Sequence, residues 1–130
     1  MMNKLSIEKI PENRDLDGVK RWEEEKGEFV QIAYAEEMRH LAWFTIKAGF
    51  WRGMHYHEKK EEIFYVVSGK IRARFVDLST KQEEEHILEK GHKIRLQPGL
   101  WHIFHALEDS SVVEYSPQFY DKTDAPKLEL

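Results

Sequence analysis

The middle of the chain alternates between apolar and polar side chains with a period of two. In the run 70–75, every second residue (Ile71, Ala73 and Phe75) is apolar and the residues between them are basic. This period is that of a β-strand with one face in a core and the other in water. Eight segments rich in Val, Ile, Phe, Tyr and Trp are predicted as strands, and several of them alternate in this way: 28–35, 41–48, 62–67, 70–76, 86–88, 93–96, 101–106 and 112–115.

Turn-forming residues separate these segments. Gly53, Gly69 and Gly91 admit a positive φ, Pro98 presets φ, and the side chain of Asp109 can bond back to the backbone. Many short strands, with no long amphipathic helical pattern, predict an all-β fold, either a sandwich or a barrel.

The first 27 residues carry a weaker pattern. Leu5 and Ile7 flank Ser6, which predicts a short edge strand, and the segment 19–26 fits a strand or a turn of helix. The length of 130 residues is that of one domain, so we expect 1–130 to fold as a single unit.

Composition narrows the function classes. The chain has no cysteine, which excludes disulfides, thiolate metal sites and a cysteine nucleophile, and we expect a reducing compartment, the cytoplasm. A net charge of −4 argues against a nucleic-acid partner. No apolar run approaches the roughly 18–20 residues that cross a bilayer, so no membrane partner is expected.

The histidines are crowded, since six of the seven lie between His55 and His105. On a strand, His55 and His57 project from the same face about 7 Å apart. Together with His102 and a carboxylate, Glu61 or Glu62, they form a donor set for one divalent metal with positions left open. Strand parity does not decide between the two glutamates, because the loop after His57 resets the alternation.

The spacing of these residues resembles that of the cupin family. Gly49, five residues, His55-x-His57, four residues, Glu62, six residues and Gly69 are similar to the first cupin motif in full. Counted back from Gly69, the resemblance favours Glu62 over its neighbour.

The second cupin motif is matched more loosely. Gly91, then Pro98-Gly99, two residues and His102 resemble it. The proline is directly followed by glycine, and Ala106 stands where the family usually has Asn. That Asn is structural in the family, so its loss leaves the expected ligand set intact.

The resemblance implies a small single-domain cupin β-barrel, a jelly roll of the RmlC-like kind. Its barrel core would span about 28–116, with 117–130 as an irregular tail. It also implies one divalent transition metal (Fe, Mn, Ni, Co or Zn) held by His55, His57, Glu62 and His102, although some cupins use the same histidines as bases without metal. Small cupins are usually homodimers, so the N-terminal 1–27 would supply strands to a neighbour.

A shorter resemblance indicates a reaction. Arg52-Gly53-x-His55-Tyr56 is similar to a segment of cupin epimerases and ketoisomerases that act on sugar nucleotides. The implied roles are His55 as the base and Arg52 as a clamp for an anion, on a small carbonyl-bearing substrate such as a nucleotide-linked sugar. The odd spacing of Arg52 from His55 would point them to opposite faces of a regular strand, unless a bulge at Gly53 re-aims the arginine.

Other assignments stay open. Three tyrosines are candidate proton donors: Tyr56, Tyr65 and Tyr115. The same four metal ligands would also serve an oxygenase or lyase acting on a small organic acid, in a pocket lined by aromatic residues: Trp43, Phe44, Trp51, Phe64, Trp101 and Phe104. A non-catalytic module that binds a metal or small ligand, or acts as a sensor, is the third hypothesis. The remaining histidines are expected outside the site: His40, His86, His92 and His105.

Overall fold

The computed structural model describes residues 2–130, and all the regular elements in that range are β-strands. In chain order the strands are β1 (Leu5–Lys9), β2 (Lys20–Glu24), β3 (Gly27–Gln31), β4 (His40–Ile46), β5 (Trp51–His55), β6 (Glu62–Ser68), β7 (Lys70–Asp77), β8 (Glu83–Glu89), β9 (His92–Leu96), β10 (Leu100–Ala106) and β11 (Ser110–Ser116). The all-β prediction is confirmed. Within residues 2–130 there is no helix of the length and apolarity needed to cross a membrane.

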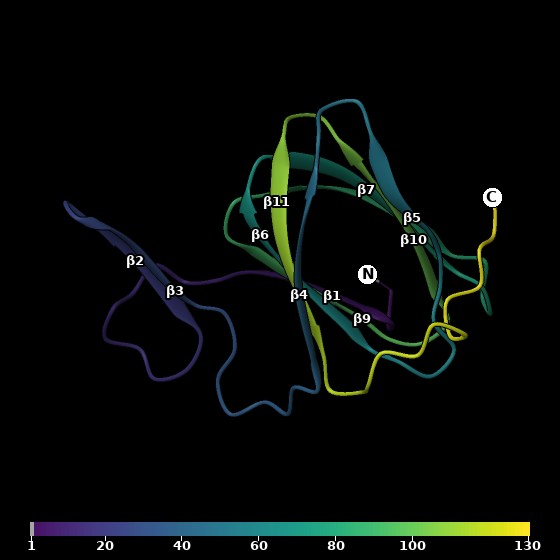
Figure 1. Ribbon diagram of the computed structural model, residues 1–130, viewed down its shortest axis with the longest axis horizontal. Helices are drawn as coiled ribbons and strands as arrows, with labels where there is room; N and C mark the ends of the chain where they lie inside the picture. Colours follow the sequence, from purple (N-terminus) through teal and green to yellow (C-terminus); the bar gives the residue numbers. More distant parts are fainter. Residues whose placement is uncertain (1) are drawn as a thin grey trace.

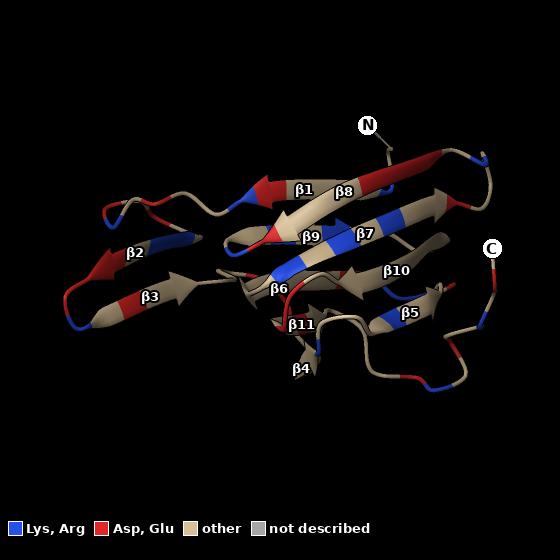
Figure 2. Ribbon diagram, turned by 90° about the horizontal axis from the view of Figure 1, so that it is seen from above, with Lys and Arg blue, Asp and Glu red and all other residues tan. Residues whose placement is uncertain are grey.

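Two antiparallel sheets pack face to face (Figures 1 and 2). One has five strands in the order β1-β9-β6-β11-β4, and the other has four in the order β5-β10-β7-β8. The hairpin β2–β3 belongs to neither sheet and projects away from them in both views (Figures 1 and 2). Neighbouring strands in space are often distant in sequence, as in a jelly roll.

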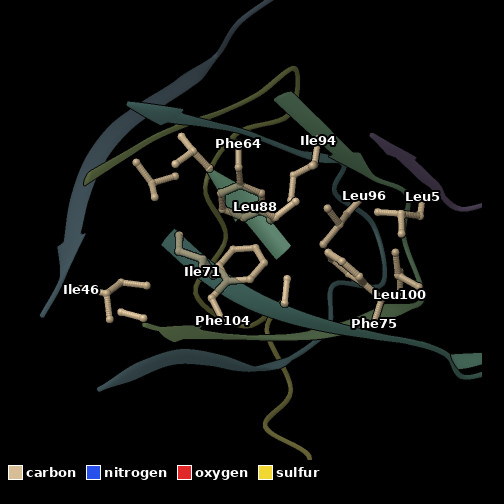
Figure 3. Packing of buried hydrophobic residues seen from close by; sticks show 14 of the residues in the cluster. Leu5, Ile46, Phe64, Ile71, Phe75, Leu88, Ile94, Leu96, Leu100 and Phe104 are labelled. Atoms are coloured by element: carbon tan, nitrogen blue, oxygen red, sulfur yellow. The ribbon is translucent and has the colours of Figure 1, made fainter. Parts of the chain in front are cut away.

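Inward-facing side chains of both sheets form one apolar core (Figure 3). On β7, Ile71 and Phe75 point into it, as the alternation predicted, and both are almost fully buried. Across the interior they meet residues of the other sheet such as Ile94 and Leu96. Each such side chain stabilises the fold by about 1.5–3 kcal/mol through burial.

The N-terminal strands differ in part from the expected arrangement. The edge strand predicted around Ser6 is present as β1, but it pairs with β9 of the same chain, so the sandwich begins at Leu5. The segment predicted as one strand at 28–35 is shorter, because β3 ends at Gln31 and pairs only with β2. The chain then crosses the outer face of the five-stranded sheet, where the carboxylate of Glu36 pairs with Lys93 and Arg95.

The C-terminal residues 117–130 contain no strand, in agreement with the expected irregular tail, but they make hydrogen bonds to the sandwich. They return along the end of β5, where Leu128 N donates to Met54 O at 3.1 Å and Tyr56 N donates to Pro126 O at 3.4 Å. Trp101 Nε1 also donates to Leu128 O at 2.6 Å. The tail thus lies against the segment that carries the paired histidines (Figure 1).

Candidate functional site

A cavity of about 370 Å³ opens between the two sheets, at the side where β4 and β5 form their edges. Its volume lies in the range of small-molecule sites. Strands of both sheets and the C-terminal tail contribute its lining: Phe44, Trp51, Arg52, Gly53, His55, Glu62, Phe64, His102, Phe104, Glu114 and Lys127.

A β-bulge in β5 brings Arg52 to this cavity. On β10, His102 pairs with His55 and the next residue pairs with Gly53, so Met54 is an extra residue on β5. Gly53 and Met54 both have positive φ, at 105° and 61°. A Cβ on Gly53 would lie 2.8 Å from the carbonyl oxygen of His102, which explains the glycine.

The bulge turns Arg52 toward the face of His55, which is the condition that the odd spacing of the two residues required. Arg52 pairs with Phe104, two residues beyond His102 on β10 and therefore on the same face. Arg52 and His55 consequently share the cavity face despite their odd spacing. Arg52 Nε donates to Thr45 O at 3.0 Å, and its guanidinium lies over the ring of Phe44.

Three of the four expected metal ligands form a compact group. His55, His57 and Glu62 offer ligand atoms within 4.8 Å of one another. His57 lies just past the end of β5, so the two histidines do not share a regular strand, yet their ring centroids are 5.2 Å apart. His102 is outside that group, although its Nδ1 is 3.9 Å from Glu62 Oε1 and its ring is 4.8 Å from that of His55.

The two neighbouring glutamates point to different places. Glu62 is buried and its Oε1 lies 3.1 Å from His57 Nε2. Glu61 turns to the other side of β6 and accepts hydrogen bonds from Arg95 at 3.3 Å and Gln97 at 2.9 Å. The structure therefore places Glu62, the glutamate that the motif spacing favours, beside the histidines.

His57 and Glu62 form a buried ion pair. Burial opposes ionisation of Glu62, but the hydrogen bond from His57 and the charges of the histidines hold its pKa at about 2. Burial likewise opposes a charge on His57, and the bond to Glu62 outweighs it, so the pKa of His57 is raised.

His55 and His102 have the opposite tendency. Burial lowers the pKa of His55, and it lowers that of His102 to about 4. Both imidazoles are therefore neutral at pH 7, each with a lone pair available. The Nδ1 atoms of both are buried without a hydrogen-bond partner in the described residues. Neutral imidazoles in a cavity are suited either to take a proton or to bind a metal.

The geometry around His57 fits a metal ligand. Its Nδ1 donates to the backbone carbonyl of Asp124, which turns Nε2 toward Glu62. A hydrogen bond of this kind to the second nitrogen is usual for metal-bound histidines. The separation of 3.1 Å between Nε2 and the carboxylate suits two ligands of one cation with bonds of about 2.1 Å, and it equally suits a shared proton.

Several residues at the site lack a signal in the sequence. Glu114 and Lys127 line the cavity but belong to no motif. Asp124 anchors the tail, because its carboxylate accepts from the backbone amides of Glu58 at 2.7 Å and Lys59 at 3.2 Å. A polar, aperiodic tail gives no indication in sequence that it packs on the histidines.

The candidate tyrosines lie outside the cavity lining. Tyr56 packs in the small cluster around Trp101 on the outer side of the four-stranded sheet. Tyr65 and Tyr115 face the outer side of the five-stranded sheet, and the hydroxyl of Tyr115 donates to Glu36 at 2.6 Å.

Some of the aromatic residues line the cavity, whereas the other histidines do not. Four of the six aromatics expected in a pocket do line it: Phe44, Trp51, Phe64 and Phe104. Trp43 is 66% exposed on the outer face, and Trp101 is buried in the separate cluster. The histidines expected outside the site are absent from the cavity lining: His40, His86, His92 and His105.

Comparisons with solved structures agree on the fold. A variant of the 3,4-ketoisomerase QdtA from Thermoanaerobacterium thermosaccharolyticum, in complex with TDP-4-keto-6-deoxyglucose, superposes with a TM-score of 0.78 at 16% identity, over 98% of this chain and 89% of that one. The dTDP-6-deoxy-D-glucose-3,5-epimerase RmlC from Legionella pneumophila, in complex with dTDP-4-keto-L-rhamnose, gives 0.74 at 18% identity, over 94% and 77%. The jelly-roll prediction is confirmed by these structural neighbours.

Sequence comparison supplies the family. UDP-2-acetamido-2,6-beta-L-arabino-hexul-4-ose reductase of Pseudomonas aeruginosa is 30% identical over 95 residues, which is 72% of this chain. The chain spans about a quarter of the length of that relative, since the match covers 26% of it. The family model described as "Cupin domain" matches residues 42–116, more than half of the chain, and this protein belongs to the cupin family.

Proposed function

We propose that this protein is an isomerase or epimerase of a nucleotide-linked sugar that carries a carbonyl group. One observation carries the proposal: the bulge at Met54 puts a cationic side chain, Arg52, and a neutral imidazole, His55, on the same cavity face. Two solved proteins of the same fold contain keto-sugar nucleotides.

The roles follow from the chemistry of the groups. The neutral imidazole of His55 takes a proton from the carbon next to the carbonyl, and the electron pair of that bond moves to the carbonyl oxygen. Arg52 sits exposed at the cavity mouth, where its planar guanidinium can bind a phosphate through two hydrogen bonds. A cavity of about 370 Å³ holds a sugar ring, and the nucleotide would then extend past Arg52.

A divalent metal is the second part of the proposal. His55, His57 and Glu62 would hold it, with His102 beside them. When bound, such a cation supplies a Lewis acid that polarises a carbonyl. His55 would then be a ligand rather than a base, so the metal content of the protein distinguishes the two mechanisms.

Proton exchange with solvent tests the reaction. The protein is incubated with TDP-4-keto-6-deoxyglucose in deuterated water, and the ring protons are followed by NMR. We expect deuterium at the carbon next to the ketone. The absence of any exchange, in both metal-free and metal-supplemented protein, would sink the proposal. Binding of TDP without exchange would instead support a non-catalytic binding module.

The anion clamp is tested by affinity. Arg52→Leu removes the cation at the cavity mouth, and we expect TDP to bind at least about tenfold more weakly in calorimetry. Arg72→Leu is the matched control, because Arg72 lies on β7 and does not line the cavity. Equal affinity of the two variants would remove Arg52 from the assigned role.

A metal-dependent oxygenase or lyase is the alternative function, and the His-His-Glu group favours it. Elemental analysis of the purified protein, with His57→Ala as the comparison, measures whether this group binds a metal. Oxygen uptake by the Fe²⁺-loaded protein in the presence of a small hydroxy acid would favour the oxygenase. Stoichiometric metal in His57→Ala would show that the metal lies elsewhere.

We also propose a homodimer. Because β1 pairs within its own chain, the hairpin β2–β3 is the N-terminal element left outside both sheets, and its Phe29 is 46% exposed. Light scattering tests this directly, since a monomer has a mass of 15.6 kDa and a dimer has twice that.

A further inference from the structure

The cavity contains a second carboxylate that the proposed mechanism does not use. Glu114 lies on β11, where Val112 and Glu114 point inward, and it lines the cavity. It is paired in the sheet with Ala42 on one side and Phe64 on the other. A glutamate at an inward position of a central strand needs an explanation, because carboxylates are rarely buried without a partner.

Glu114 and His55 belong to opposite walls of the cavity. β11 is part of the five-stranded sheet, and β5, which carries His55, is part of the four-stranded sheet. A sugar ring held between the two sheets would present one face to each wall, and its reacting carbon becomes planar in the enolate. A proton removed from one face could therefore be returned on the other.

Charged groups of both signs surround Glu114. Burial and the negative charge of Glu62 on β6 raise the pKa of Glu114, and the positive charges of Lys60, His57 and Arg52 oppose that rise. The other charged and titratable groups at the cavity are Arg52 and His55 on β5, His102 on β10 and Lys127 in the tail. Among residues 2–130, no salt bridge involves Glu114, so its proton is not committed to a neighbour.

The tyrosines do not compete for this role. A phenol is another side chain that can donate a proton, and none of Tyr56, Tyr65 and Tyr115 lines the cavity. The hydroxyl of Tyr115 already donates to Glu36 on the outer face, and the hydroxyl of Tyr65 is buried without a hydrogen-bond partner among residues 2–130.

We propose that Glu114 is a second catalytic residue, which donates a proton to the ring face opposite His55 and so makes the reaction an inversion at the carbon next to the ketone. This inference rests on the proposed function and extends that function by naming epimerisation as the reaction.

The proposed epimerisation proceeds through an enolate. His55 takes the proton, the C–H electron pair enters the carbonyl group, and an enolate forms. The enolate carbon then takes the proton of the Glu114 carboxylic acid from the opposite face, and the carbonyl is restored. His55 ends protonated and Glu114 ends as a carboxylate, and exchange of both with water resets the site.

The variant Glu114→Gln separates the two half-steps. Because His55 remains, exchange of the ring proton for deuterium should continue with retention of configuration. Inversion, read from the NMR coupling constants of the product, should fall by about 10²–10⁴-fold. Glu114→Asp keeps the acid on a shorter side chain, and we expect partial recovery of inversion.

Two controls separate the loss of a proton donor from a loss of folding. Binding of TDP by Glu114→Gln, measured by calorimetry, shows that the variant is folded, and Tyr65→Phe should invert at the wild-type rate. Inversion at the wild-type rate in Glu114→Gln would overturn the inference. Loss of exchange together with inversion, while TDP still binds, would overturn it too. A wild-type protein that exchanges no proton would instead refute the proposed function itself.

Discussion

The interior of the sandwich has two halves that share the same two sheets and serve different purposes. Toward β1, β9, β7 and β8, in what we call the packed half, the inward positions hold apolar side chains (Figure 3). Examples that do not line the cavity are Leu5, Ile71, Leu88 and Ile94. Toward β4, β5, β10, β11 and the start of β6, in what we call the open half, the inward positions include histidines, carboxylates and an arginine around a cavity.

One alternating pattern of side chains can therefore build either a core or a site. The two halves differ in the side chains at the inward positions, and these side chains affect the stability of the fold differently. Apolar residues of the packed half stabilise the fold by leaving water. Buried polar groups of the open half lower stability, as does Nδ1 of His55, which has no hydrogen-bond partner in residues 2–130.

The largest expected effect is on activity in the open half. His55→Asn removes the proposed base, and deuterium incorporation should fall by about 10²–10⁴-fold. Urea unfolding should show little change in stability, since the amide of Asn replaces one polar group at this position with another. A strong loss of stability with normal exchange would reverse the comparison between the two halves.

A matched change in the packed half should do the opposite. Leu88, on the edge strand β8, is 1% exposed and packs in the core. Leu88→Ala should lower the free energy of unfolding by about 2–5 kcal/mol, through lost burial and the remaining cavity. Exchange activity per folded molecule should stay near that of the wild type, and a selective loss of activity would contradict a purely structural role.

A smaller effect, dependent on pH, is expected for the His57–Glu62 pair. The pKa of Glu62 is lowered in the folded protein and that of His57 is raised, so the pair stabilises the fold between their unfolded values, about 4.5 and 6.5. The stabilisation is lost as pH falls toward 2 and as pH rises through the folded pKa of His57.

The measurement is urea unfolding of metal-free protein and of Glu62→Gln across this range. The difference should reach about 1.5 kcal/mol near pH 5.5 and shrink on both sides. A difference that does not vary with pH would show that the hydrogen bond acts without the charges.

The smallest expected effect is local, in the tail. Asp124→Ala removes the acceptor for the amides of Glu58 and Lys59, and their hydrogen exchange should speed up by about tenfold. Amides of β7 in the packed half should keep their protection. Asp121→Ala is the control, because the Asp121 carboxylate accepts its hydrogen bonds from Thr123, within the tail. Equal acceleration throughout the sandwich would show that the two halves open together.

Much of this arrangement was predictable from local pattern. Alternation identifies the β7 core residues Ile71 and Phe75, and motif spacing predicts that His55, His57 and Glu62 lie together. Both signals work because they depend on short sequence distances, where the strand period fixes which side chains share a face.

The rest depends on contacts that sequence distance does not encode. Glu114 is inward only because of the pairing of β11 with β4 and β6, and a strand read alone does not say which face is the core. Asp124 and Lys127 reach the site through an aperiodic tail. The pairing of β1 with β9 joins two strands that are far apart in the sequence.

The bulge at Met54 also bears on how related chains should be aligned. Met54 is the residue without a partner on β10, so a chain lacking it would still pair His55 with His102 and Arg52 with Phe104. The shortened strand would be regular and would present the same two side chains to the cavity. An alignment that requires two residues between the arginine and the histidine would treat the arginine of such a chain as missing. The strand pairing shows instead that a one-residue gap at position 54 preserves the site.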